Sequence, residues 1–124
     1  MDITAVERLV DTYCSAWSEP DPVRRRRTLD EIWAPEATYT DPRAHLIGAA
    51  ALCAHIGTIL AGRPGAKIVR TSVLDCHHGL VRFAWRVVQA DGSLLPEGLD
   101  LAEISDDGRI LRIIGFFGPL AAKS

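Results

Sequence analysis

The chain has 124 residues and is 48% hydrophobic, which predicts a single domain over residues 1–124 with one core. Its 14 Lys and Arg residues against 16 Asp and Glu give a formal net charge of −2, so we expect no nucleic acid partner. The 3 cysteines have no close pair, which fits neither a disulfide framework nor a zinc site and favours a reducing cytoplasm.

The first predicted helix begins at Ile3, because apolar residues recur from there at steps of three and four through Tyr13 to Trp17. No apolar run approaches the roughly 20 residues that cross a bilayer, and the first ten residues lack the layout of a secretory signal. We therefore expect a cytoplasmic protein that does not contact a membrane.

A break at Pro20 separates this helix from a second one. Asp21 is suited to cap the second helix and Pro22 to occupy its first position, and the helix is expected to reach about Trp33. Its run of four arginines, Arg24–Arg27, is interpreted as a solvated face.

Pro35 is expected to end the second helix, and residues 37–41 then predict a short strand that closes at Asp41 before Pro42. A loop follows, and a third helix is predicted from about Gly48 to Ala61, where glycines and a proline terminate it.

From residue 66 to residue 117 the chain is β-rich, with turns at residues 77–79, 91–92 and 107–108. An Asp-Gly pair between β-rich flanks is the strongest short-range hairpin signal, and it occurs at two of these turns. The pattern predicts an antiparallel meander of four long strands. Helices followed by hairpins predict an α+β fold, with three N-terminal helices packed on one face of a curved, mainly antiparallel sheet.

The strand at residues 98–104 is partly apolar on both faces. One face carries Leu99, Leu101 and Glu103, and the other carries Asp100, Ala102 and Ile104. A second subunit on the outer face would explain this pattern, so we expect a homodimer formed through the outer face of the sheet.

Tyr13, Asp41 and Asp100 place a phenol and two carboxyl groups on otherwise apolar segments. A buried polar group needs a partner, so such residues are candidates for function. Taken singly, each also has an ordinary interpretation: Tyr13 as a core tyrosine, Asp41 as a turn initiator, and Asp100 as an exposed residue if the strand's faces are exchanged.

Four segments together resemble a known fold over nearly the whole chain. They are residues 13–17, residues 37–42, residues 99–101 with the turn that follows them, and the closing residues 115–118. This layout is similar to the cone-shaped fold shared by nuclear transport factor 2 (NTF2), ketosteroid isomerase and the SnoaL-like polyketide cyclases.

The resemblance to ketosteroid isomerase implies a role for each of the three polar residues. Asp41 would be the base, while Tyr13 and a protonated Asp100 would donate hydrogen bonds to the substrate oxygen. The implied activity is proton transfer on a small apolar carbonyl compound, without cofactor or metal. Candidate substrate-binding residues are Trp17, Trp33, Tyr39, His45, Ile56, Phe83, Trp85 and Phe117. The sequence departs from the isomerase at Ile56, where that family has a tyrosine, and in a shorter loop after Asp41.

Two alternatives stay open. A hydrolase resembling limonene epoxide hydrolase would need an arginine, such as an inward Arg70, to bridge Asp41 and Asp100. A binding or assembly domain without catalysis would hold an apolar ligand in the cone and have Asp100 exposed or paired with a cation.

Overall fold

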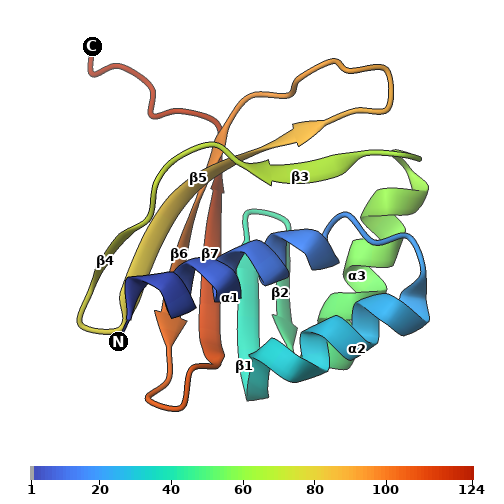
Figure 1. Ribbon diagram of the computed structural model, residues 1–124. Helices are drawn as coiled ribbons and strands as arrows, with labels where there is room; N and C mark the ends of the chain where they lie inside the picture. Colours follow the sequence, from blue (N-terminus) through green and yellow to red (C-terminus); the bar gives the residue numbers. More distant parts are fainter. Residues whose placement is uncertain (1) are drawn as a thin grey trace.

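The computed structural model describes residues 2–124 as three helices packed against one curved sheet (Figure 1). In chain order the elements are α1 (Ile3–Ala16), α2 (Pro22–Ile32), β1 (Trp33–Asp41), β2 (Ala44–Ile47), α3 (Ala49–Ala61), β3 (Lys67–Arg70), β4 (Asp75–His77), β5 (Leu80–Val88), β6 (Gly98–Ile104) and β7 (Ile110–Phe117). The α+β class predicted from the sequence is confirmed.

The sheet has the order β2-β1-β7-β6-β5-β3, and β4 also pairs with β5. Strands β1 and β7 run parallel, whereas the other neighbours are antiparallel. The sheet is therefore mixed, and β7 lies between β1 and β6. This arrangement brings the end of β1 and the middle of β6 to either side of one strand.

Both N-terminal helices begin where the sequence predicted. The side chain of Asp2 accepts a hydrogen bond of 3.1 Å from the backbone N–H of Thr4, and Asp21 accepts one of 2.9 Å from Val23. Pro22 occupies the first turn of α2, where its missing N–H has no helical partner to lose.

The third helix is not directly N-terminal in the way the sequence suggested, because it follows two strands. Residues 44–47, expected to be a loop, form β2 and pair antiparallel with β1. Four residues between a turn and a glycine are too few to show a clear alternation of apolar and polar residues, so the sequence did not predict this strand.

The meander also differs from four long strands. Its first part is divided into β3 and β4, both of which pair with β5. Between them, the backbone N–H of Thr71 donates to the carbonyl of Ala84 over 2.9 Å, and the hydroxyl of Ser72 accepts from the N–H of Ala84 over 2.8 Å. These bonds hold the bend between β3 and β4 against β5.

The second helix ends at Ile32, and β1 begins at once at Trp33, four residues earlier than expected. Pro35 therefore lies inside a strand. The strand tolerates it because the β1–β7 register shifts between Trp33 and Thr38, and Glu36 takes a positive φ of 62°.

The interpretation of Arg24–Arg27 as a solvated face is wrong for Arg25, which is 3% exposed. Its guanidinium donates to the carbonyl oxygens of Glu19, Pro20 and Cys53 over 3.0, 3.1 and 2.9 Å. Arg25 thus ties the α1–α2 connection to α3.

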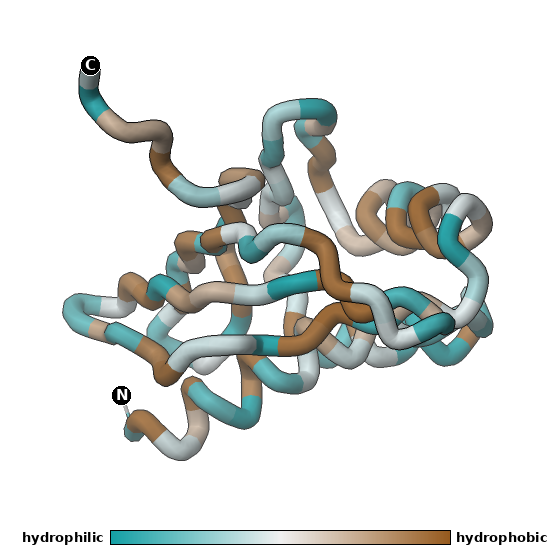
Figure 2. The backbone as a smooth tube through the Cα atoms, turned by 90° about the horizontal axis from the view of Figure 1, so that it is seen from above, coloured by the Kyte–Doolittle hydropathy of each residue, from teal (hydrophilic) through white to brown (hydrophobic). Residues whose placement is uncertain are grey.

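The core fills the space between the helices and the concave face of the sheet. Viewed from above, brown apolar stretches occur both in the helices and in the sheet, between teal polar ones (Figure 2). Within residues 2–124, none of the helices is long and apolar enough to cross a membrane.

Candidate active site

A cavity of about 540 Å³ lies between the helices and the concave face of the sheet. The three polar residues singled out in the sequence, Tyr13, Asp41 and Asp100, all line it, although they come from α1, β1 and β6. Five of the candidate substrate-binding residues also line the cavity: Trp17, Tyr39, Phe83, Trp85 and Phe117. The fold thus brings an acid-base group of residues into one mainly apolar space.

Asp100 points into the cavity, and it is 5% exposed while its neighbours Leu99 and Leu101 are 37% and 39% exposed on the opposite face. Its Oδ1 accepts a hydrogen bond of 2.8 Å from the indole N–H of Trp85. Burial raises the pKa of Asp100 to about 7; the Trp85 hydrogen bond opposes this shift and the charge of Asp41 adds to it. Near neutral pH this carboxyl group can therefore carry a proton.

Asp41 ends β1 and accepts hydrogen bonds at both carboxyl oxygens. The hydroxyl of Tyr39 donates to Oδ2 over 2.6 Å, and the backbone N–H of Arg43 donates to Oδ1 over 2.8 Å. Burial, followed by the hydrogen bond to Asp41 and its charge, raises the pKa of Tyr39 well above its ordinary value. Two donors therefore hold the Asp41 carboxyl group in one orientation at the end of β1.

Tyr13 approaches the same space from α1 and is 2% exposed. Its ring stacks on that of Trp33, with ring centroids 6.1 Å apart and planes inclined by 13°. Burial raises the pKa of Tyr13 well above its ordinary value, and the nearby charge of Asp100 raises it further. Tyr13 therefore keeps its proton and is available as a hydrogen-bond donor.

Two glycines leave room for the side chains of Asp100 and Trp85 on the concave face. A Cβ at Gly115 of β7 would lie 2.9 Å from Oδ1 of Asp100 and 3.7 Å from Cβ of Asp41, so both aspartates flank this glycine. A Cβ at Gly98 of β6 would lie 2.3 Å from Cζ2 of Trp85. Any side chain at either position would have to displace a group of the site.

Comparison with known proteins shows which family the chain belongs to. No family model and no curated protein sequence matches the chain. A solved structure from Agrobacterium tumefaciens, described as a candidate isomerase of the SnoaL-like family, is 31% identical, with a TM-score of 0.88 over 94% of this chain and 99% of its own. This chain belongs to the SnoaL-like family.

Two further solved structures share the fold of this SnoaL-like protein. One is described as a candidate polyketide cyclase from Sinorhizobium meliloti, at 19% identity and a TM-score of 0.71 over 93% of this chain and 99% of its own. The other is described as a candidate SnoaL-like polyketide cyclase from Jannaschia, at 15% identity and a TM-score of 0.66 over 89% of this chain and 85% of its own.

Three expected substrate-binding residues of the SnoaL-like chain do not line the cavity. Trp33 is 3% exposed, and its indole N–H donates to the carbonyl of Ala37 over 3.0 Å, so it is part of the core behind Tyr13. His45 pairs with Thr40 across β1 and β2, on the sheet face away from Asp41, and its Nδ1 lies 2.7 Å from the Thr40 hydroxyl.

The third is Ile56, which is fully buried in the core. His55, one residue earlier on α3, lines the cavity instead, with its ring centroid 6.0 Å from that of Trp17 and 6.1 Å from that of Tyr39. One residue turns a helical side chain by about 100°, and both sides of α3 are apolar, so the sequence did not distinguish the two positions.

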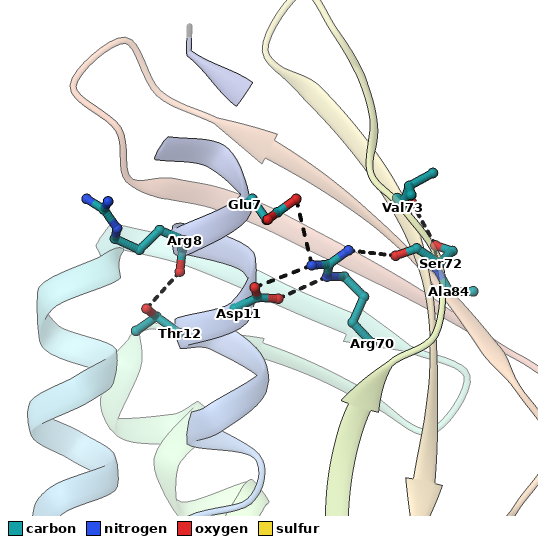
Figure 3. Close-up of polar contacts among 8 residues, drawn as sticks. All are labelled: Glu7, Arg8, Asp11, Thr12, Arg70, Ser72, Val73 and Ala84. Atoms are coloured by element: carbon teal, nitrogen blue, oxygen red, sulfur yellow. Dashed lines mark hydrogen bonds and ion pairs between the residues drawn. The ribbon is translucent and has the colours of Figure 1, made fainter. Parts of the chain in front are cut away.

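The arginine that an epoxide hydrolase would require is engaged elsewhere in the SnoaL-like chain. Arg70 of β3 binds Asp11 of α1 over 2.9 Å and lies 3.9 Å from Glu7, and it donates to the carbonyl of Ser72 over 2.6 Å (Figure 3). Arg70 therefore fastens α1, which carries Tyr13, to β3, and it does not bridge Asp41 and Asp100.

Proposed function

We propose that this SnoaL-like protein is an enzyme that moves a proton on a small apolar carbonyl compound, as an isomerase or cyclase that needs no cofactor. The observation that carries the proposal is the shared cavity of Asp41, Asp100 and Tyr13. In that cavity one carboxyl group is held by two donors and the other has a pKa of about 7. The family resemblance to isomerases and cyclases supports the same reaction class.

The proposed first step is removal of a proton by the Asp41 carboxylate from the carbon next to the substrate carbonyl. The electron pair of the C–H bond moves to form a C=C bond, and the carbonyl oxygen becomes the enolate oxygen. Tyr13 and protonated Asp100 donate hydrogen bonds to that oxygen. Preorganised donors in a site of low polarity are typically the largest contribution to such a reaction.

In an isomerase the substrate also has a C=C bond beside the carbon that loses the proton, so the enolate is conjugated with that bond. The second step returns the proton from Asp41 to the far carbon of that bond, which restores the carbonyl group and brings the double bond into conjugation with it. In a cyclase the enolate carbon would instead attack a second carbonyl carbon of the same molecule, whose oxygen takes up the proton from Asp41. Both reactions begin with the same proton removal, so one assay can test them together.

The test is solvent deuterium exchange into a panel of apolar ketones, followed by mass spectrometry, beside calorimetric binding of the same ketones. We expect exchange above the buffer rate for ketones that bind, and a loss of about a hundredfold or more in Asp41→Asn. The matched control is Asp75→Asn, an exposed aspartate of β4 outside this cavity. Ketones that bind without exchanging, or equal exchange in Asp41→Asn, would contradict the proposal.

A binding domain without catalysis is less well supported. That reading required Asp100 to be exposed or paired with a cation, whereas Asp100 is 5% exposed and its bond is to a neutral indole. Binding alone would not need a carboxyl group of raised pKa beside a second carboxyl group.

We also propose a homodimer formed through the outer face of β5, β6 and β7. Cross-strand pairing places Leu99 beside Phe116 and Leu101 beside Ile114 on this face, while Arg82 lies next to Leu101 and Glu103 next to Leu80. Leu99 and Leu101 are 37% and 39% exposed, and Phe116 is 53% exposed. A second copy of the same surface would remove this apolar area from water.

Analytical ultracentrifugation tests the dimer. We expect the unaltered protein to sediment as a dimer and Leu101→Lys as a monomer, while Leu94→Lys, at an exposed residue between β5 and β6, remains dimeric. A monomer of the unaltered protein would contradict the proposal.

A further inference from the structure

The rim of the cavity carries two cations that the proposed reaction does not use. Arg63 and Lys67 line the cavity and are exposed, whereas Tyr13 and Asp100 at its depth are buried. The two cations come from the segment after α3 and the start of β3, which follow one another at the upper right of Figure 1. Positive charge is therefore gathered at the open end of the cavity.

These cations have no carboxylate partner within the part of the chain that the structure describes. The ion pairs found in residues 2–124 involve Arg24, Arg26, Arg70, Arg82 and Arg112. The guanidinium of Arg63 donates to the neutral Oε1 of Gln89 over 2.8 Å. The charges at the rim are thus available to an anion.

The acidic groups lie away from Arg63 and Lys67. Lys67 pairs with Val88 of β5, whereas Asp100 pairs with Phe83, five residues earlier on the same strand. Among the described residues that line the cavity, the acids are Asp41 and Asp100, both beside Gly115. A ligand with negative charge near this pair would be repelled, while negative charge at the rim would be attracted. The cavity therefore distinguishes the two ends of an elongated molecule.

We propose that the substrate is an apolar ketone that carries an acidic tail, a carboxylate or similar anion, with the ketone at the two aspartates and the tail at Arg63 and Lys67. This inference rests on the proposed function for the placement of the ketone. Binding the tail would hold the reacting carbon beside Asp41 in one orientation, as remote binding groups do in catalysis.

Isothermal titration calorimetry with a matched ligand pair tests the inference. The pair is 4′-acetylbiphenyl-4-carboxylate, an aryl methyl ketone whose carboxylate lies at the opposite end of the two rings, and its primary amide, which has the same shape without the charge. At low salt we expect the carboxylate to bind about tenfold more tightly than the amide, and added salt to reduce this advantage.

The double variant Arg63→Gln/Lys67→Gln should lower the affinity for the carboxylate about tenfold and leave that for the amide unchanged. The matched control Arg24→Gln/Arg27→Gln removes the same charge from exposed positions of α2 and should change neither affinity. Equal affinity for the two ligands, no binding of the carboxylate, or equal weakening of both ligands in the rim variant would overturn the inference.

Deuterium exchange separates this inference from the proposed function. If the amide binds as well as the carboxylate and also exchanges, the acidic tail is wrong and proton transfer stands. If the carboxylate binds more tightly in the expected way but does not exchange, the tail site stands and proton transfer is wrong.

Discussion

The indole N–H of Trp85 donates a hydrogen bond of 2.8 Å to Oδ1 of Asp100, and the indole ring lies against Gly98. Trp85 pairs with Gly98 between β5 and β6, and a Cβ at Gly98 would lie 2.3 Å from Cζ2 of the indole. The ring of Trp85 also meets that of Phe117 edge-on, with centroids 6.2 Å apart. An indole that only a glycine can accommodate therefore opposes the effect of burial on the pKa of Asp100.

Replacing Trp85 with Phe should move the pH profile of deuterium exchange to higher pH. The indole N–H stabilises the ionised form of Asp100 and so lowers its pKa; without it, that pKa rises above about 7. Because protonated Asp100 is the proposed donor, exchange should persist to higher pH before it declines.

The control for this change is Trp33→Phe, which removes an indole N–H that is bonded to the carbonyl of Ala37 and not to a carboxyl group. It should lower stability without moving the pH profile. A profile that stays in place or moves to lower pH in Trp85→Phe would show that the indole does not set the state of Asp100.

Replacing Gly115 with Ala should slow exchange about a hundredfold while the protein stays folded. The new Cβ would lie 2.9 Å from Oδ1 of Asp100, so this carboxyl group must move, and a displacement of about 1 Å in an active site can cost this much in rate. The rate is measured by deuterium exchange and the fold by circular dichroism. Gly62→Ala is the control, because a Cβ there has no contact under 3.6 Å. An unchanged rate of deuterium exchange in Gly115→Ala would contradict the inference that the site needs a glycine at this position.

Asp100 should make the fold less stable as pH rises. Its pKa is about 7 in the folded protein and 3.8 ordinarily, so the folded state binds more protons between these values. The free energy of unfolding therefore falls as pH rises from about 4 to 7, and the penalty remains at higher pH. A shift of this size corresponds to about 4 kcal/mol at most.

Asp100→Asn should remove this penalty, since an amide oxygen can still accept from Trp85 but does not ionise. Urea unfolding at a series of pH values measures the effect. The variant should gain stability relative to the unaltered protein as pH rises from 4 to 7 and be indistinguishable in its pH slope below that range. A difference in unfolding free energy between the two proteins that stays constant across this range would contradict a raised pKa for Asp100.

Strong periodicity explains which parts of the site could be predicted from the sequence. The helical stripe of α1 predicted that Tyr13 is buried. The alternation in β6 placed Asp100 on the face opposite Leu99 and Leu101, and the structure shows that the face of Asp100 is the inward one. By contrast, His55 and Ile56 lie on a helix that is apolar on both sides, so periodicity did not choose between them.

The remaining differences come from contacts between segments distant in the sequence. Strand β2 owes its existence to pairing with β1, and Pro35 is tolerated because β1 shifts register against β7. The burial of Arg25 depends on Gly57 of α3, where a Cβ would lie 2.9 Å from its Nη1. No local pattern in the sequence records such a contact.

Arg25 is expected to be the most important arginine for stability. Arg25→Met would keep most of the side-chain volume but leave the buried carbonyl group of Cys53 and the part-buried carbonyl groups of Glu19 and Pro20 without their donor. A buried carbonyl group that loses its partner costs about 1 to 3 kcal/mol and a part-buried one less, so a loss of roughly 2 kcal/mol or more is expected. Arg27→Met, at an exposed position of the same helix, should change stability by less than about 0.5 kcal/mol. Urea unfolding compares the two variants. A similar small loss in both would mean that water replaces the guanidinium, and that the α1–α2 connection does not depend on it.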